Sequence, residues 1–421
     1  MPLDPRRPAS RRPLLGLAMI VRDAGQFLAP LLREARPHVD EIVVVDTGSR
    51  DGSREVAAGL GARVLEFPWV DDFAAARNAS LAACDAAWLL CLDADEQLCP
   101  ADWRRLRETA AAWRTAPPLA GSIVTRNYVR EPWSRRGWEP VPVPDPHALP
   151  GHADGVAPGF VPTRKVRLFP NDPAVRFQGR LHETVEASLA ARGIPVTDLA
   201  VAVHHFGLLA ADAGKPARYL ALARAKTTDQ PGDAAAWAEL ADCAVATGDR
   251  ALALAACERA LALRPDAPAE RLTAGWLLLE AGELARADAQ LLAVAAGAGA
   301  SDRQVGEACH LRAQVAIRDG RSEAAGSLLA AALRLLPADG HVQNTLGTWH
   351  LTGGRGEPAR AALERAAELL PHLAEPCLNL ARLYEAAGHP DLAARQYERA
   401  LARDPSRAQA ATATRSLAAR A

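Results

Sequence analysis

Residues 89–98 read LLCLDADEQL, an apolar run that ends abruptly in the acids Asp93, Asp95 and Glu96. A buried strand with this ending presents two carboxylates at its carboxyl end, and the two-residue period of a strand predicts that Asp93 and Asp95 point the same way. Carboxylates in this arrangement favour Mg²⁺ or Mn²⁺, which bind a few acids together with substrate phosphates. A helix N-terminus decorated with acids is the alternative interpretation of an isolated D-x-D, and the surrounding sequence distinguishes the two.

The composition of the chain narrows the class of protein. Its 421 residues are enough for two or three domains. A net charge of −1, with 24% charged residues, provides no basic excess for binding nucleic acid. The seven cysteines are odd in number and include no C-x-x-C pair. Scattered thiols of this kind favour a reducing cytoplasm over a disulfide framework or a zinc site.

The start of the chain has one feature of a targeting signal. Arg11 and Arg12 precede the apolar run LLGLAMIV at 14–21, which resembles a short signal sequence. The run stops at two charged residues, lacks a small-residue cleavage site and is too short to span a bilayer. We therefore interpret 14–21 as the first core strand and residues 1–13 as a disordered tail. No other stretch reaches transmembrane length.

Between residue 14 and about residue 116, apolar strand patterns alternate with amphipathic helix patterns. Continuous apolar strands in this order predict an α/β domain with a mostly parallel sheet and helices on both faces. Ligands of such open sheets bind at the carboxyl ends of the strands, where VVVDTGS and LLCLDAD place their acids. The predicted strands are 14–21, 41–49, 62–69 and 87–95, and the predicted helices are 25–39, 53–62 and 73–85.

Residues 117–165 differ in composition from the alternating pattern before them. Prolines cluster there and aromatic residues appear, which predicts a loop-rich insertion where an acceptor docks or a lid closes. Further on, VRLFPN and VRFQGRLHETVE predict a strand and a turn that return to the sheet, and VTDLAVAVHHFG predicts a last strand. We expect this domain to span 14–210, followed by a connecting helix at 211–233.

The C-terminal half is rich in alanine and repeats itself. Five glycines recur at intervals of 34, 38, 34 and 34 residues, and prolines keep most of the same spacing. A 34-residue helix–turn–helix period is typical of a solenoid. We expect five repeats over 234–410 and a C-terminal tail at 411–421. The glycines are Gly248, Gly282, Gly320, Gly354 and Gly388.

The last repeat unit, residues 374–405, reads AEPCLNLARLYEAAGHPDLAARQYERALARDP and resembles the tetratricopeptide family. Small residues at Ala381 and Ala393 let paired helices approach, and Gly388 ends the first helix of the unit. The resemblance implies a curved helical array that binds a protein or peptide partner.

Four segments of the N-terminal domain carry a second resemblance. They are MIVRDAG, VVVDTGSRDGS, DDFAAARNASL and WLLCLDADEQL, in that order along the chain. With this order and spacing they resemble a family 2 glycosyltransferase of the GT-A fold, over roughly residues 14–207. The resemblance implies a metal-dependent, inverting transfer of a sugar from a nucleoside-diphosphate sugar. The acceptor stays open: a glycan, a lipid-linked glycan, a peptide or a protein.

The resemblance also implies residues that bind the donor. Asp46 is expected to accept hydrogen bonds from the base or ribose, and Arg77 either pairs with donor phosphate or braces the acidic edge. Arg167 is a further candidate for the phosphate. The family usually has asparagine-glutamate after the first strand, where this chain has Arg22-Asp23-Ala24. Asp23 is therefore expected to replace the missing acid one position early.

For the metal, the resemblance implies that Asp95 ligates Mn²⁺ or Mg²⁺ directly, while Asp93 contacts the ribose or a metal-bound water. The cation neutralises the leaving diphosphate. A late histidine supplies a further ligand in many GT-A enzymes, and His204 and His205 are the candidates. A capped or core histidine is the alternative for either of them.

An inverting transferase needs a general base that deprotonates the acceptor. In GRLHETVE we expect Glu183 to be this base, with Glu186 as the second choice. His182-Glu183 is not the H-E-x-x-H zinc motif, because Glu186 occupies the place of the second histidine.

A second hypothesis comes from a different functional class. A tetratricopeptide scaffold whose transferase domain has decayed is favoured by Arg22-Asp23-Ala24 and opposed by the intact Asp46, Arg77, Asp93 and Asp95. Under either hypothesis we expect a bacterial protein without a transmembrane segment, in the cytoplasm or peripheral at the inner face of the membrane, with no nucleic-acid partner.

Overall fold

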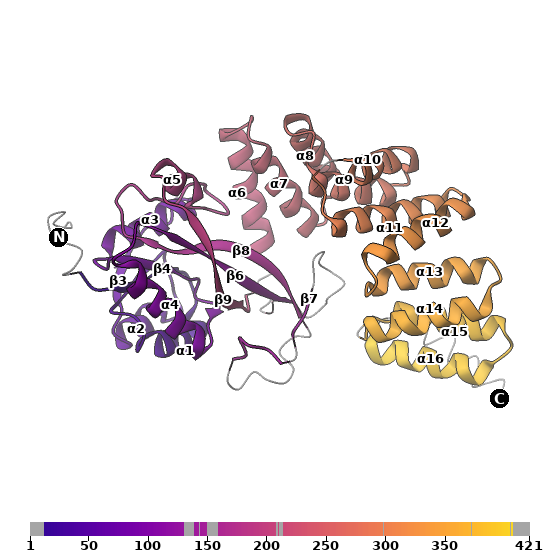
Figure 1. The fold of residues 1–421 in the computed structure, drawn as a ribbon, viewed down its shortest axis with the longest axis horizontal. Coiled ribbons are helices and arrows are strands. Elements are labelled where there is room, and N and C mark those ends of the chain that lie inside the picture. Colours follow the sequence, from indigo (N-terminus) through magenta and orange to yellow (C-terminus); the bar gives the residue numbers. More distant parts are fainter. Residues whose placement is uncertain are drawn as a thin grey trace. The chain divides into compact units, whose positions relative to one another are not determined.

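The structure is a computed structural model that describes residues 12–129, 139–142, 144–149, 159–207, 209, 214–297, 299–371, 373–404 and 406. The chain divides into two compact units, Met1–Lys215 and Pro216–Ala421. The first is an α/β unit and the second is all-α (Figure 1). Of the helices that the structure describes, none has the length and apolar character needed to cross a bilayer. Most of the predicted N-terminal tail and the whole predicted C-terminal tail lie outside the described residues.

Four strands of the first unit run parallel to one another, in the spatial order β3-β2-β1-β4. The residues of β1, β2 and β4 are almost all buried, as expected for continuous apolar strands that are covered by helices on both faces. This half of the sheet confirms the predicted alternation. The strands are β1 Leu15–Val21, β2 Glu41–Asp46, β3 Arg63–Glu66 and β4 Trp88–Cys91.

The other half of the sheet contains antiparallel pairs, so the sheet as a whole is mixed. β8 (Gly159–Pro170) runs antiparallel to both β4 and β6 (Ala120–Val129). β9 (Val196–His205) is parallel to β6, and the short β5 (Glu96–Gln97) is antiparallel to β9. β7 (Glu139–Pro140) pairs with β8. Because β5 follows β4 directly, the acidic segment between them connects the two halves of the sheet.

The prediction of a loop-rich insertion at 117–165 is wrong for its two ends. Residues 120–129 form the whole of β6, and residues 159–165 form the first part of β8. The sequence AGSIVTRNYV contains β-branched and aromatic residues that fit a strand, and eight of its ten residues are buried. The prolines that follow it had favoured the prediction of a loop. Trp133, Trp138 and Pro150, which also contributed to it, lie outside the described residues.

Helices cover both faces of the sheet (Figure 1). On one face, α1 (Gly25–Ala35), α2 (Ser53–Gly59) and α4 (Pro100–Trp113) pack against β1, β2 and β4. On the other face, α3 (Phe73–Ala83) and α5 (Glu186–Ala191) pack against the alternate side chains of the same strands. Asp72 is the N-cap of α3, and its carboxylate accepts a hydrogen bond from the Ala75 amide at 2.9 Å.

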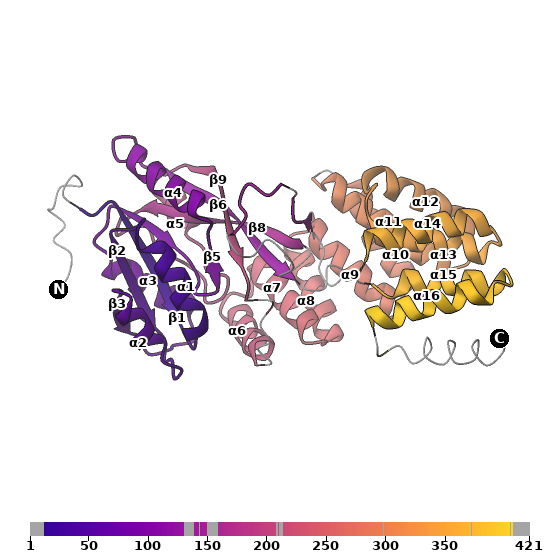
Figure 2. The same ribbon diagram turned by 90° about the horizontal axis from the view of Figure 1, so that it is seen from below.

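The second unit begins with α6 (Lys215–Asp229), in the region predicted as a connecting helix. Ten further described helices follow as five consecutive antiparallel pairs, and Figure 2 shows the last pair, α15 and α16, side by side. The pairs are α7 (Ala234–Ala246) with α8 (Arg250–Leu263), α9 (Pro268–Glu280) with α10 (Leu284–Ala296), α11 (Asp302–Arg318) with α12 (Ser322–Leu335), α13 (Gly340–Thr352) with α14 (Gly356–Leu369), and α15 (Glu375–Ala386) with α16 (Pro390–Arg403).

The recurring glycines lie at the turns within these pairs. Each of the five has a positive φ, between 70° and 79°, a left-handed conformation that glycine adopts without steric cost. Between the paired helices, Ala381 and Ala393 are fully buried and pack with Tyr397. The 34-residue period of the sequence is therefore the period of the helical hairpins.

Candidate active site

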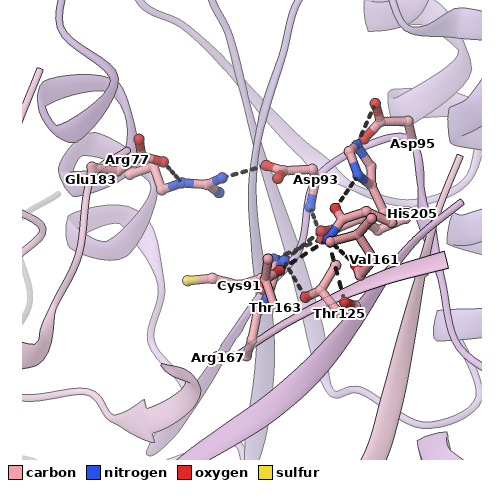
Figure 3. Close-up of polar contacts among 12 residues, drawn as sticks. Arg77, Cys91, Asp93, Asp95, Thr125, Val161, Thr163, Arg167, Glu183 and His205 are labelled. Carbon is pink, nitrogen blue, oxygen red and sulfur yellow. Dashed lines mark hydrogen bonds and ion pairs between the residues drawn. The ribbon is translucent and has the colours of Figure 1, made fainter. Parts of the chain in front are cut away.

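The acidic segment forms a tight turn between β4 and β5. β4 ends at Cys91, so Asp93 and Asp95 do not belong to a strand, and the prediction that they point the same way is wrong. The turn is closed by two bonds: the Asp93 amide donates to Glu96 Oε2 at 2.8 Å, and the Glu96 amide donates to the Asp93 carbonyl at 3.1 Å. Figure 3 shows the carboxylates of Asp93 and Asp95 directed to different partners.

Glu96 anchors this turn from inside the protein. It forms a buried ion pair with Arg167 of β8, in which Arg167 Nη1 donates to Glu96 Oε2 at 2.7 Å. Arg167 also donates to the Thr125 hydroxyl at 3.1 Å. Burial raises the pKa of Glu96 above its ordinary value, against the opposing charge of Arg167. Only 4% of the Arg167 side chain is exposed, so this placement does not favour its predicted contact with donor phosphate.

Arg77 of α3 joins two acids that are distant in sequence. Its Nε donates to Glu183 Oε1 at 2.6 Å, and its Nη2 forms an ion pair with Asp93 Oδ1. Burial alone would raise the pKa of Asp93, but the charge of Arg77, with that of Arg167, holds it well below its ordinary range. The arginine thus braces the acidic edge, which is one of the two roles expected for it.

The neighbouring Asn78 docks a loop onto α3. Its side chain forms two hydrogen bonds with the backbone of Phe177, accepting from the amide at 2.8 Å and donating to the carbonyl at 3.0 Å. The Arg77 guanidinium lies over the Phe177 ring, 5.5 Å from its centroid. Together the two residues of the RN pair hold the segment that carries Glu183 against the acidic turn. Nothing in the sequence pattern singled out Phe177.

Asp95 and His205 form the other side of the turn. Asp95 Oδ2 lies 3.3 Å from His205 Nε2, and the two side chains are 22% and 17% exposed. Burial opposes a charge on His205, but the hydrogen bond and charge of Asp95 raise the pKa of the imidazole above its ordinary value. A Cβ on Gly207 would overlap Asp95 Oδ2, so only a glycine at this position leaves room for the pair.

His204, the other predicted metal ligand, lies on the opposite face of β9 because strand side chains alternate. Its Nδ1 is 2.8 Å from the Tyr128 hydroxyl, and its Nε2 is 2.8 Å from the His147 carbonyl. Both ring nitrogens are therefore engaged within the fold. Burial lowers the pKa of His204 to about 4. The structure places it as a core histidine, the alternative that the sequence left open.

Asp46 and Asp23 lie at the carboxyl edge of β2 and β1. Asp46 is 2% exposed, and its carboxylate accepts hydrogen bonds from the amides of Gly48 and Ser49 at 3.1–3.2 Å. Asp23 adopts a φ of 50° and accepts a bond from the Arg50 amide at 2.7 Å. Both carboxylates thus accept hydrogen bonds from backbone amides of the loop that follows β2. Their predicted contacts with base and ribose stay predictions.

A separate cavity of about 570 Å³ lies on the opposite face of β6 from Asn127 and His205. Its lining includes Arg126 and Arg164. These two cations are paired with acids: Arg126 binds Asp145 through two bonds of 2.6 and 3.0 Å, and Arg164 lies 3.0 Å from Asp198. The cavity does not include the acidic turn, and we assign no ligand to it.

The pair Asp95 and His205 fits a small divalent cation. Adjacent ligands of an octahedral ion with bonds of about 2.1 Å lie roughly 3 Å apart, close to the 3.3 Å between these two atoms. No group of three or more His, Cys, Asp or Glu side chains that could hold a metal occurs in the described ranges. At Mg²⁺ sites, substrate phosphates and water commonly complete the set of ligands.

These features define an α/β domain with a polar site at one sheet edge, joined to a helical-repeat unit. Residues 18–163 match a family model described as "Glycosyl transferase family 2", and residues 234–267 and 377–409 match models described as "Tetratricopeptide repeat". The N-terminal unit thus contains a family 2 glycosyltransferase domain, and the C-terminal unit contains tetratricopeptide repeats.

Individual relatives cover only parts of the chain. A tetratricopeptide repeat-containing protein of Synechococcus elongatus is 36% identical over 178 residues, which are 42% of this chain and 36% of that protein. An uncharacterized glycosyltransferase of Rickettsia felis is 31% identical over 80 residues, or 19% of this chain and 28% of that protein. The chain spans about a third of the length of these curated relatives.

Among solved structures, the crystal structure of PilW, a type IV pilus biogenesis factor, aligns with a TM-score of 0.43 and 17% identity. The alignment covers 48% of this chain and 91% of that chain.

Proposed function

We propose that this protein is a metal-dependent, inverting glycosyltransferase that uses a nucleoside-diphosphate sugar. The observation that carries the proposal is the Asp95–His205 pair, whose Oδ2 and Nε2 atoms lie 3.3 Å apart and remain partly exposed. Asp93, Glu96 and Glu183 each pair with a buried arginine, whereas Asp95 pairs with an imidazole. Asp95 is therefore the acid of this cluster with the most capacity to bind a cation.

Asp95 and His205 would hold Mn²⁺ or Mg²⁺ in this proposal. The bound ion would neutralise the leaving diphosphate as a Lewis acid. Beside it, Arg77 pairs with Asp93 and keeps that carboxylate ionised and fixed in direction. Asp46 and Asp23, at the neighbouring strand ends, are the proposed contacts to base and ribose, and ligand binding at this edge is the rule for open α/β sheets.

Glu183 is the proposed general base. One of its oxygens, Oε1, accepts the Arg77 Nε–H, and an ionised carboxylate keeps acceptor capacity at its second oxygen. That second oxygen could take the proton from an acceptor hydroxyl, thiol or amide as it attacks the anomeric carbon on the face opposite the diphosphate. Arg77 fixes the direction of the carboxylate, which favours a defined approach of the acceptor.

The tetratricopeptide unit is proposed to bind a protein or peptide, either a partner or the acceptor itself. Its support is the stack of helical hairpins over 234–403, because helical repeats form extended surfaces on which peptides dock. The two functions are separable: the acidic turn lies wholly in the first unit.

The experiment measures diphosphate release by the full chain from a panel of UDP- and GDP-sugars, with Mn²⁺, Mg²⁺ or EDTA. Each donor is also tested by thermal shift, because a ligand that binds the folded state raises the melting temperature. We expect one donor to give metal-dependent release in the wild type, and Asp95→Asn to lose it. Asp198→Asn, at an exposed ion pair, is the matched control and should behave as wild type.

A decayed scaffold makes the opposite prediction. No donor would then give release or a metal-dependent thermal shift, and Asp95→Asn would leave the cellular phenotype of the wild type unchanged. Release that is unaffected by EDTA and by Asp95→Asn would instead contradict the metal-dependent mechanism while leaving the transferase class intact.

A further inference from the structure

Asn127 of β6 is the immediate neighbour of His205 in the parallel pairing of β6 with β9. Its side-chain oxygen Oδ1 lies 2.8 Å from His205 Nδ1. On its other side, Nδ2 donates to the Val161 carbonyl at 2.8 Å and to the Thr163 hydroxyl at 3.0 Å. The amide therefore connects the histidine to two residues of β8.

These bonds determine which way the amide points. A backbone carbonyl only accepts hydrogen bonds, so the atom of Asn127 that faces Val161 must be the NH₂ group. The oxygen then faces His205, and because it can only accept, the Nδ1 of His205 must carry a hydrogen. In the neutral ring the lone pair is consequently on Nε2, the nitrogen that lies beside Asp95.

We propose that Asn127 is a positioning residue that holds His205 in the Nδ1–H tautomer and so presents the Nε2 lone pair, next to Asp95, to a divalent cation. This inference rests on the proposed metal site. Histidines that bind metals usually donate their other ring hydrogen to a carbonyl or carboxylate, which fixes the orientation and tautomer of the ring. Here the amide oxygen of Asn127 has that role.

The next residue along β6, Tyr128, provides a matched control for Asn127. Tyr128 also contacts a β9 histidine through its hydroxyl, which is 2.8 Å from His204 Nδ1. The other nitrogen of His204 meets the His147 carbonyl rather than an acid. Tyr128→Phe therefore removes a ring hydrogen bond of the same length, from the same pair of strands, without touching the proposed site.

The first measurement is the affinity of the full chain for Mn²⁺ alone, by electron paramagnetic resonance of the free ion. We expect Asn127→Leu to bind about 10- to 100-fold more weakly than wild type, the usual cost of losing an outer partner of a metal ligand. Tyr128→Phe should bind as wild type does. His205→Gln should lose the same binding more completely.

The second measurement needs no metal. In the full chain labelled with ¹⁵N-histidine, the ring nitrogens of His205, assigned with His205→Gln, report which nitrogen carries the hydrogen. Wild type and Tyr128→Phe should show hydrogen on Nδ1 in the neutral ring, and Asn127→Leu should lose that preference. A variant that is merely destabilised would not change the tautomer of a histidine in the folded population.

The outcomes separate the two proposals. If His205→Gln weakens Mn²⁺ binding but Asn127→Leu keeps both wild-type affinity and the Nδ1–H tautomer, the role of Asn127 is wrong and the metal site stands. If His205→Gln and Asp95→Asn leave Mn²⁺ binding unchanged, the metal site itself is wrong, and the inference is overturned with it.

Discussion

The two aspartates of the acidic turn are two residues apart, yet they belong to different environments. Asp93 is paired with the buried guanidinium of Arg77, which also binds Glu183. Asp95 faces the imidazole of His205 and has no arginine partner among the described residues, although its side chain is 22% exposed against 32% for Asp93. A carboxylate that already has an arginine partner gains less from a cation than one that has only an imidazole. In the proposed mechanism, Asp93 therefore organises the site and Asp95 binds the cation.

The largest effect is expected on the Arg77 side. Arg77→Met leaves Asp93 and Glu183 without their buried partner, and breaking a buried ion pair in this way typically costs about 3–5 kcal/mol. Arg192→Met is the matched control, because Arg192 pairs with Asp172 at the surface, 53% exposed, where such pairs contribute about 0–1 kcal/mol. Denaturant unfolding of both variants checks this. Equal stabilities would show that the ion pairs of Arg77 with Asp93 and Glu183 do not stabilise the fold.

A smaller effect is expected on the His205 side, from Gly207→Ala. The added Cβ would overlap Asp95 Oδ2 and force the carboxylate away from His205, and displacements of about 1 Å at a reacting site can cost about 100-fold. We expect this loss in Mn²⁺ affinity and in diphosphate release. Gly59→Ala is the control, since a Cβ there meets nothing within 4 Å. Wild-type Mn²⁺ binding by Gly207→Ala would place the cation elsewhere.

The smallest effect is expected on the pH dependence of stability, where the two histidines of β9 should differ. The pKa of His204 is lowered to about 4 by burial, below the ordinary value of about 6.5 in an unfolded chain. As the pH falls, the unfolded state therefore binds the proton first. The contribution of neutral His204 to the free energy of unfolding is present above pH 6.5 and is lost as the pH falls toward 4. Between pH 7 and pH 5.5, His204 alone should lower the free energy of unfolding by about 1 kcal/mol.

His204→Gln should reduce that pH dependence by the same amount, measured as the difference in unfolding free energy from wild type at the two pH values. His205 has the opposite sign, because its pKa is raised. Its charged form contributes stability that is present below its unfolded pKa and lost as the pH rises through the folded value. His205→Gln should therefore not reduce the loss of unfolding free energy between pH 7 and pH 5.5. If it does, His205 rather than His204 is the histidine that is buried in the neutral form.

Much of the fold could be predicted from local patterns, and the exceptions have physical causes. β1, β2, β4 and the helices between them follow from continuous apolar strands alternating with amphipathic helices. β6 was missed because the proline-rich stretch after it obscured a strand of ordinary composition. The helical repeats were predictable because one glycine recurs at each left-handed turn.

The candidate site was predictable as a set of residues but not as a set of contacts. Arg77, Asp93 and Glu183 were each singled out, with no indication that the Arg77 guanidinium joins the two acids. Asp93 and Asp95 were expected to point the same way along a strand. The strand ends at Cys91, and in the turn that follows the two carboxylates face different partners. Asn127 and Gly207 were missed because an asparagine in a strand and a glycine after one carry no local signal of a ligand site.

The order of the motifs and their periods was enough to establish the kind of domain and the helical array, because strand and helix periodicity are local properties of the chain. Which acid pairs with an arginine and which with an imidazole was decided by packing, because Arg77, Arg167 and His205 come from three other elements. Charge balance in a buried cluster is a property of neighbours in space, and the linear sequence does not record those neighbours.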